Sequence, residues 1–201
     1  MKSNYIIEKE NELDSLLGDD SEFRFIGGSS KVKILVDKDC AKLPYVKVKM
    51  KGERYISLSL KINKFGKVKY TTLGRYLLGL TDPEIYCDHI NRNPLDNRLC
   101  NLRAATPLEN SLNKMLPTGI SGYKNVVING DNYRIDFVRN WKIERYHVPT
   151  RTPPFFAAIV ADCMNLKYNK EFVTTNFDKS LYTDGFIDLV IDNFFAIKNK
   201  K

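Results

Sequence analysis

The sequence predicts an α+β protein in which a small antiparallel sheet precedes a compact strand-and-helix unit, followed by a three-stranded sheet packed on a helix. Two patterns predict this class. Several short stretches alternate apolar and polar residues, which is the two-residue period of strands that bury one face. Other stretches place apolar residues at helical spacing behind a capping residue. With 201 residues, of which 43% are hydrophobic, the chain can form one or two small domains with buried cores.

The charge is strongly asymmetric along the chain. Residues 1–22 contain seven acidic residues and two lysines, a net charge of −5. Because the whole chain carries +8, the remaining residues carry +13. A basic body fits an anionic partner, first of all nucleic acid, although many basic proteins bind no such partner. We therefore expect residues 1–30 to be an acidic leader that precedes a polyanion-binding body.

One helix is expected within the leader. A helix over residues 4–17 would place Ile6, Leu13 and Leu17 on one face. Residues 27–30, a Gly-Gly-Ser-Ser run, interrupt this pattern and are typical of a linker.

A two-residue period predicts strands in the next part of the chain. A strand is expected over residues 31–36, residues 46–50 alternate apolar residues with lysine, and residues 56–62 alternate in the same way beyond a turn at 52–53. One face of this hairpin would be apolar and the other polar and rich in lysine. We favour a solvated outer face, and the alternative is a surface that follows DNA phosphates.

Two helices with caps should follow. The first is expected over residues 73–80, directly after a threonine cap. The second has Thr106 as its cap, Pro107 at the first helical position and Glu109 three residues after the cap. This is a capping box with the proline where its missing N–H costs nothing, and the helix should run to about residue 115.

The last third of the chain returns to strands and then to helices. Three strands are expected over residues 123–128, 133–138 and 142–148. Residues 129–131 contain an Asn-Gly pair, which is a strong hairpin signal between the first two strands. A helix should begin near Pro153 and continue through Leu166. From Asp184 a second amphipathic helix is suited to docking on the body or to self-association.

The residues between Asp88 and Asn113 carry the chemistry of this sequence. His89 is one of only two histidines, stands next to an aspartate, and precedes a loop rich in Asn, Asp and Pro. An imidazole with its usual pKa, ~6.5, can accept a proton near neutral pH. Carboxylate and amide oxygens suit a hard cation such as Mg²⁺, and nearby arginines can hold phosphate groups. Together these groups supply what phosphodiester hydrolysis needs.

Residues 88–113 read DHINRNPLDNRLCNLRAATPLENSLN. This string resembles the motif of the HNH nuclease family, D-H-I-N-x-N-x-x-D-N-R-x-x-N-L-R followed by T and by E-N-x-x-N. The separations of 12 residues from His89 to Asn101 and 21 from His89 to Asn110 match that motif. The resemblance implies a ββα-metal unit, in which a strand, a loop, a second strand ending at Asn101 and a helix surround one divalent ion.

The resemblance also implies roles for individual residues. His89 would be the general base, and Asn101 would orient it through the other ring nitrogen. Asp88 and Asn110 would bind the metal ion, with Asn113 as a further candidate ligand. The arginines expected to contact DNA are Arg92, Arg98 and Arg103. Because neighbouring residues of a regular strand point to opposite faces, Asp88 and His89 can serve one site only if the strand ends or twists there.

The expected cofactor is Mg²⁺ or Mn²⁺, because the ligand set consists of oxygens. A zinc site is not expected, since none of the four cysteines forms a C-x-x-C pair. We find no signal-peptide pattern and no stretch long enough to span a membrane. We therefore expect an intracellular protein with free thiols, in the cytoplasm or nucleus of a host, without a membrane partner.

Two weaker resemblances extend from the motif. Residues 31–80 resemble the amino-terminal part of phage and viral HNH homing-type endonucleases, so residues 31–117 would form the nuclease domain. Residues 118–176 resemble the plant ethylene-response-factor type of DNA-binding domain, whose sheet enters the major groove. That family has a tryptophan where this chain has Tyr133. Residues 177–201 would add a C-terminal helix.

Alternation on the second strand of this domain predicts its DNA-facing side. Tyr133, Ile135 and Phe137 share one face, which should pack on the following helix. Arg134 would then project outward. Lys124 and Arg145 are expected to join it from neighbouring strands, where such side chains can reach guanine edges.

The function that these features favour is a metal-dependent, site-specific endonuclease of homing type that cuts double-stranded DNA. Two alternatives are a sequence-specific DNA-binding regulator on an inactive HNH scaffold and a non-specific nuclease. The intact set of Asp88, His89, Asn101 and Asn110 favours an enzyme. The second DNA-binding domain favours a specific one. The target sequence, nicking against double-strand cleavage, and the oligomeric state stay open.

Overall fold

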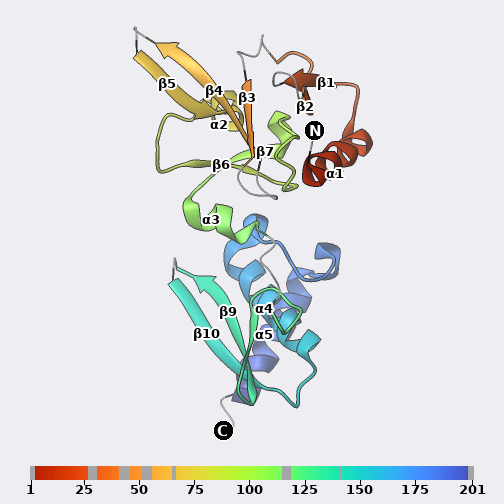
Figure 1. Cartoon of the computed structure of the whole chain (residues 1–201). Helices are drawn as coiled ribbons and strands as arrows, with labels where there is room; N and C mark the ends of the chain where they lie inside the picture. Colours follow the sequence, from red (N-terminus) through yellow and green to blue (C-terminus); the bar gives the residue numbers. More distant parts are fainter. Residues whose placement is uncertain are drawn as a thin grey trace. The chain divides into compact units, whose positions relative to one another are not determined.

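The structure, a computed structural model, confirms the α+β class with several small antiparallel sheets (Figure 1). It describes residues 3–26, 31–40, 46–50, 56–64, 67–114, 119–140 and 142–198. The chain divides into two compact units, Met1–Asn110 and Ser111–Lys201. Within the described residues, no helix combines the length and the apolar composition that a bilayer crossing requires.

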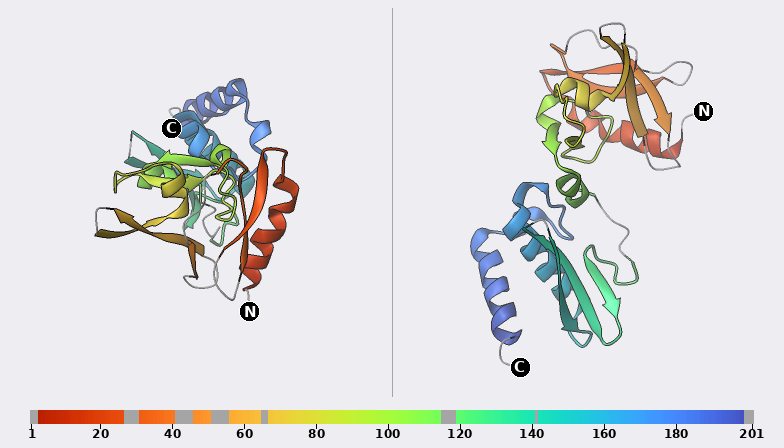
Figure 2. Two further views of the ribbon diagram at one scale, coloured as in Figure 1. Left: turned by 90° about the horizontal axis from the view of Figure 1, so that it is seen from above. Right: turned by 90° about the vertical axis from the view of Figure 1, so that its left-hand side faces the viewer.

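The N-terminal segment is part of the core of the first unit. Helix α1 (Asn4–Glu12) and a 3₁₀ turn, η1 (Asp14–Leu16), precede strand β1 (Ser21–Ile26), which pairs antiparallel with β2 (Val32–Asp37). Helix α1 lies along this hairpin (Figure 1, Figure 2). The buried residues of the segment include Ile6 and Leu13, as expected, whereas Leu17 is exposed. The residues expected to form a leader therefore stabilise the fold, and the expected linker at 27–30 lies outside the described residues.

The predicted hairpin is present and has a third strand. Strands β3 (Val46–Met50), β4 (Ile56–Lys64) and β5 (Lys67–Thr72) form an antiparallel sheet in the order β3-β4-β5. Val46, Leu58 and Leu60 are buried on its inner face, as the alternation predicts. The expected turn at 52–53 lies outside the described residues. Strand β5 was not predicted, because Lys-Val-Lys-Tyr-Thr-Thr carries too few apolar residues to show a period.

Helix α2 (Leu73–Leu77) begins after the expected threonine cap and ends earlier than predicted. The Thr72 hydroxyl accepts a hydrogen bond from the backbone N–H of Arg75 at 3.5 Å. Gly79 has a φ of +64°, a left-handed conformation that ends the helix without steric cost. Gly74 faces Cys87 so closely that an added Cβ would collide with the sulfur. This glycine therefore lets the helix pack against the strand that carries Asp88 and His89.

The motif forms a two-stranded ladder and a helix. Strand β6 (Tyr86–His89) pairs antiparallel with β7 (Leu102–Ala105), and helix α3 (Pro107–Leu112) follows. The second strand begins after Asn101, whereas it was expected to end there. Asn101 is instead the last residue of a 3₁₀ turn, η2 (Leu99–Asn101).

The second unit is built on a three-stranded antiparallel sheet, as predicted. Its strands β8 (Val126–Asn129), β9 (Asn132–Arg139) and β10 (Lys142–Pro149) lie in the order β10-β9-β8. Helix α4 (Pro154–Asn169) packs on the sheet. Tyr133, Ile135 and Phe137 are buried in the core beneath α4, which confirms the predicted inner face.

The C-terminal helix packs beside α4 and also contacts the sheet, because Phe194 and Phe195 lie against Tyr146 of β10. Helix α5 (Asp184–Lys198) follows two 3₁₀ turns, η3 (Lys170–Phe172) and η4 (Lys179–Leu181), and runs beside α4 (Figure 2). Its buried residues are Ile187, Ile191 and Phe194, so the amphipathic pattern serves docking on the body.

Candidate functional site

The β6–β7 ladder sets an ion pair at the centre of the motif. Asp88 lies opposite Arg103 in the register, and its side chain is only 5% exposed. Arg103 Nε and Nη2 lie 2.8 Å and 2.7 Å from the same carboxylate oxygen, Oδ2. A buried carboxylate is costly unless it is paired, so this arginine stabilises Asp88 in place. Arg103 was expected to hold phosphate, but in the structure it compensates the charge of the expected metal ligand.

His89 is the last residue of β6, where the strand gives way to a turn. Its backbone oxygen accepts a hydrogen bond from Arg92 N at 2.8 Å, and Arg92 has a left-handed φ of +63°. The strand therefore ends at His89, which is the condition for Asp88 and His89 to serve one site. Arg92 itself is exposed and can contact a phosphate.

The environment of His89 favours the neutral imidazole. Burial lowers the pKa of His89 below its ordinary value, while contact with the Asn97 amide and the nearby charges of Asp88 and Asp96 oppose this shift. His89 Nε2 lies 3.4 Å from Asn97 Oδ1. Because an amide oxygen accepts hydrogen bonds, this contact favours a proton on Nε2 and the basic lone pair on Nδ1. A neutral imidazole of this kind can accept a proton from water.

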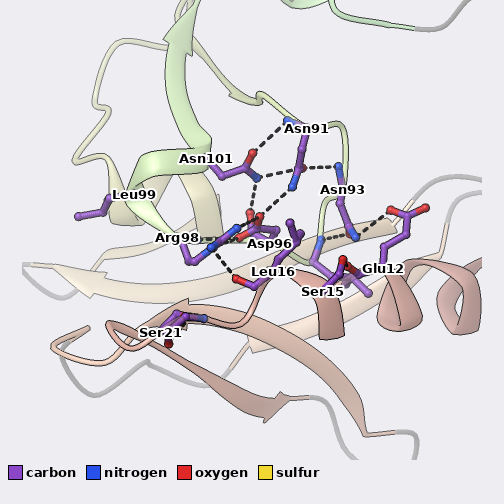
Figure 3. Close-up of polar contacts among 12 residues, drawn as sticks. Glu12, Ser15, Leu16, Ser21, Asn91, Asn93, Asp96, Arg98, Leu99 and Asn101 are labelled. Atoms are coloured by element: carbon purple, nitrogen blue, oxygen red, sulfur yellow. Dashed lines mark hydrogen bonds and ion pairs between the residues drawn. The ribbon is translucent and has the colours of Figure 1, made fainter. Parts of the chain in front are cut away.

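Asn101 holds the loop that follows His89. Its Oδ1 accepts from Asn91 N at 3.0 Å, and its Nδ2 donates to Asn91 Oδ1 at 3.0 Å and to Asp96 O at 2.8 Å (Figure 3). Both amide hydrogens of Asn101 are therefore committed to the loop. The expected bond from Asn101 to the His89 ring is not formed, and the ring contacts Asn97 Oδ1 instead. The backbone oxygen of Asn101 accepts from Ile90 N at 2.9 Å. Asn101 thus fixes the residue next to His89 through the backbone.

Arg98 has a structural role. Its Nε and Nη2 donate to Asp96 Oδ1 and Oδ2, both at 2.8 Å, and its Nη1 donates to Leu16 O at 2.8 Å. The side chain of Asp96 is fully buried and that of Arg98 is 18% exposed. Arg98 was expected to contact DNA, but all three guanidinium nitrogens are engaged inside the fold (Figure 3). Replacing a protein partner by a phosphate would leave Asp96 buried without compensation.

Sequence reasoning missed the residues that support this loop from the N-terminal segment. Asn93 Nδ2 donates to Lys9 O at 2.9 Å and to Glu12 Oε2 at 3.1 Å (Figure 3). Strand β2 contributes as well, because Leu35 N donates to Leu95 O at 2.9 Å. No local signal indicates these contacts, since they join residues more than 50 positions apart.

Asn110 lies one turn into α3. The capping box is confirmed, because Thr106 N donates to Glu109 Oε2 at 2.8 Å and Glu109 N donates to Thr106 Oγ1 at 3.3 Å. Asn110 is half-buried, and among the described residues its side chain has no hydrogen-bond partner. The helix therefore presents an amide oxygen that is not engaged elsewhere in the described part of the chain.

The donor set fits a hard divalent cation. Among the described residues, no group of three or more His, Cys, Asp or Glu side chains could hold a metal ion. The candidate oxygen ligands at this motif are the Asp88 carboxylate and the Asn110 amide. Such oxygen-only sets suit Mg²⁺ or Mn²⁺.

Asn113 belongs to the second unit. Thr174 Oγ1 donates to Asn113 O at 2.8 Å and lies 3.1 Å from Asn113 Oδ1. The side chain of Asn113, a further candidate metal ligand, therefore contacts Thr174.

Lys124 is buried and does not face solvent. The residue is 2% exposed, and its Nζ donates to Leu112 O at 2.6 Å and to Thr174 O at 3.1 Å. It was expected on the DNA-facing side of the sheet, but it precedes β8 and ties two chain segments together. Lys124 lies outside β8, so the alternation of the strand does not determine where its side chain points.

The outer face of β8, β9 and β10 carries the other two expected DNA-contacting residues. Arg134 Nε and Nη2 lie 2.9 Å and 3.0 Å from the two carboxylate oxygens of Asp136. Arg145 lies opposite Asp136 in the register, with its Nε 3.8 Å from Oδ1 and a side chain that is 57% exposed. The structure therefore brings Arg134 and Arg145 together around one aspartate, as the alternation predicts for a shared face.

Comparison with known proteins gives one partial match. A stretch of 62 residues, 31% of this chain, is 40% identical to an uncharacterized HNH endonuclease of Acanthamoeba polyphaga mimivirus. The chain spans about a third of that relative, 32% of its length. No family model matches the chain, and no solved structure resembles it significantly.

Proposed function

We propose that this chain is a divalent-metal-dependent DNA endonuclease of the HNH type. The similarity to an HNH endonuclease supports a nuclease acting on nucleic acid. The observation that carries the finer proposal is the arrangement within β6, β7 and α3. These consecutive elements present a buried carboxylate, an imidazole whose pKa burial lowers, and an amide oxygen that has no hydrogen-bond partner among the described residues.

His89 is the general base of the proposed reaction. The imidazole accepts the proton of the attacking water, and its lowered pKa keeps it in the accepting form at neutral pH. Asp88 and Asn110 would hold Mg²⁺ or Mn²⁺, which when bound would stabilise charge on the phosphate and the leaving oxygen. Arg103 orients Asp88, and the Asn101 backbone fixes the turn beside His89.

Target recognition is proposed for the second unit. The outer face of its sheet presents Arg134 and Arg145, and an arginine on an exposed sheet can donate two hydrogen bonds to a guanine edge. The resemblance of residues 118–176 to the ethylene-response-factor type of domain favours double-stranded DNA. On this basis the cleavage is site-specific, as in homing-type endonucleases.

One observation favours a second candidate, a DNA-binding regulator on an inactive HNH scaffold. The Asp88 carboxylate already has a cationic partner in Arg103. If the two groups stay paired, the guanidinium takes the place of a metal ion, and the motif serves only as a stable scaffold.

A cleavage assay on supercoiled plasmid separates these candidates. The enzyme predicts conversion to nicked or linear plasmid with Mg²⁺ and none with a chelator. The regulator predicts DNA binding with intact plasmid under both conditions. Conversion that persists in excess chelator contradicts the metal-dependent mechanism.

A further inference from the structure

The outer face of the sheet β3-β4-β5 in the first unit is exposed and carries charge of a single sign. Its inner face packs into the core through Val46, Leu58 and Leu60. The register therefore turns the intervening residues outward, and Lys47, Lys49 and Lys61 are all exposed. Strand β3 contributes two of these lysines and β4 the third, and none of the three strands contains an acidic residue.

These lysines are not compensated within the described part of the chain. Lys47, Lys49 and Lys61 form no ion pair with any described residue, although lysines elsewhere in the first unit, such as Lys9 and Lys33, pair with carboxylates. An ordinary solvated surface mixes charges of both signs. A face of one sign favours an anionic partner.

Hydroxyl groups lie between the lysines in cross-strand rows. Lys47 pairs with Ser59, which in turn pairs with Thr72 on β5, and Lys61 pairs with Tyr70. Tyr70 is 75% exposed. Lysine and hydroxyl side chains are the groups that donate to phosphate oxygens in protein–DNA complexes.

The spacing of the face suits the backbone of a duplex. Alternate residues of a strand are ~7 Å apart, and neighbouring strands are ~4.8 Å apart. Each DNA strand carries a phosphate every ~3.4 Å of helix axis, so several phosphates fall within reach of such a grid. The face has no arginine and one described aromatic residue, which fits backbone contact better than base reading.

We propose that the outer face of β3-β4-β5 is a DNA-binding surface that contacts the sugar-phosphate backbone of duplex DNA without reading its sequence. The inference rests on the proposed function in one respect, that DNA is the substrate. The face would hold the duplex for the nuclease unit independently of the second unit.

The test compares two double variants of the full chain that remove equal charge. Lys47→Gln with Lys49→Gln changes the proposed face, whereas Lys31→Gln with Lys38→Gln changes two exposed lysines beside β2. Binding to a labelled duplex of unrelated sequence is measured against salt concentration with a chelator present, so that cleavage does not contribute. Thermal melting of both variants verifies that they are folded.

The face variant should bind more weakly, and its slope of log K against log salt should be shallower by about 1.8, since each phosphate contact contributes ~0.9. The control variant should keep a slope close to that of the wild type. Equal slopes for the two variants overturn the proposal.

A cleavage assay with Mg²⁺ separates this inference from the proposed function. If the wild type never cuts plasmid but the face variant has the shallower slope of log K against log salt, the binding surface stands and the endonuclease proposal fails. If the wild type cuts but both variants retain the wild-type slope, the endonuclease proposal stands and this surface is overturned.

Discussion

Asp88 and Arg103 face each other across the β6–β7 ladder, and both guanidinium nitrogens of the contact converge on a single carboxylate oxygen. The pair explains how a strand can present a carboxylate that is almost completely buried. It also means that the residue expected to bind metal and the residue expected to bind phosphate are coupled. Substitution of either one changes the other.

His89→Ala should reduce plasmid cleavage by about 10²–10⁴-fold, because it removes the proposed general base. DNA affinity in the presence of a chelator should change little. His147→Ala is the matched control, since His147 is the other histidine and is exposed on β10. Cleavage by the His89 variant at the wild-type rate would contradict the assignment.

Arg103→Ala should lower the free energy of unfolding by about 3–5 kcal/mol, because it removes the cationic partner of the buried Asp88 carboxylate. Chemical denaturation measures this loss. The double variant with Asp88→Asn should lose less than the sum of the two single variants. Arg92→Asn is the control for an exposed arginine, and asparagine tolerates the left-handed φ at that position. Additive losses would show that the pair is not coupled.

Lys124→Met should destabilise the second unit by about 1–3 kcal/mol, since the carbonyl groups of Leu112 and Thr174 lose their shared donor. Chemical denaturation followed by circular dichroism measures this loss. The salt dependence of DNA binding should stay unchanged for the folded variant. A shallower salt slope would return Lys124 to the DNA interface.

Asp162 should make the stability of the second unit dependent on pH. Burial raises the pKa of the Asp162 carboxyl above its usual value, although Tyr182 Oη and Asn176 donate hydrogen bonds to it. A raised folded-state pKa favours the protonated form. The stability that Asp162 contributes is therefore fully present below the unfolded pKa, ~3.9, and is lost as pH rises through the higher folded pKa.

The measurement compares chemical unfolding of the wild type and Asp162→Asn at several pH values, with circular dichroism as the signal. Wild-type stability relative to the variant should fall as pH rises above ~3.9. A difference that stays constant or grows with pH would show that hydrogen bonding, and not burial, controls this carboxyl.

Local patterns predicted local structure well. The capping box at Thr106 and Glu109 and the inward set of β9 follow from neighbouring residues alone, and both are present. The burial of Lys124 and the engagement of Arg98 with Leu16 depend on segments about 50 and 82 residues away. Periodicity shows which residues share a face but does not show what covers that face.

The same distinction applies to the candidate site. The family resemblance implies Asp88, His89 and Asn110 as site residues, and the elements expected around them are present. Their roles stay predictions. The detailed roles were less predictable. Asn101 and Arg98 belong to a hydrogen-bond network whose geometry the sequence does not specify.

The hydrogen bonds from Asn93 to Lys9 O and from Arg98 to Leu16 O also bear on how such proteins diverge and how they can be recombined. Because backbone oxygens accept these two bonds, the bonds depend on the path of the chain at residues 9 and 16. A chimera that carries a motif loop from another protein would also need the N-terminal segment of that protein, because the loop and this segment are joined by hydrogen bonds. The useful exchange unit is therefore the first compact unit as a whole, Met1–Asn110, and not the motif loop alone.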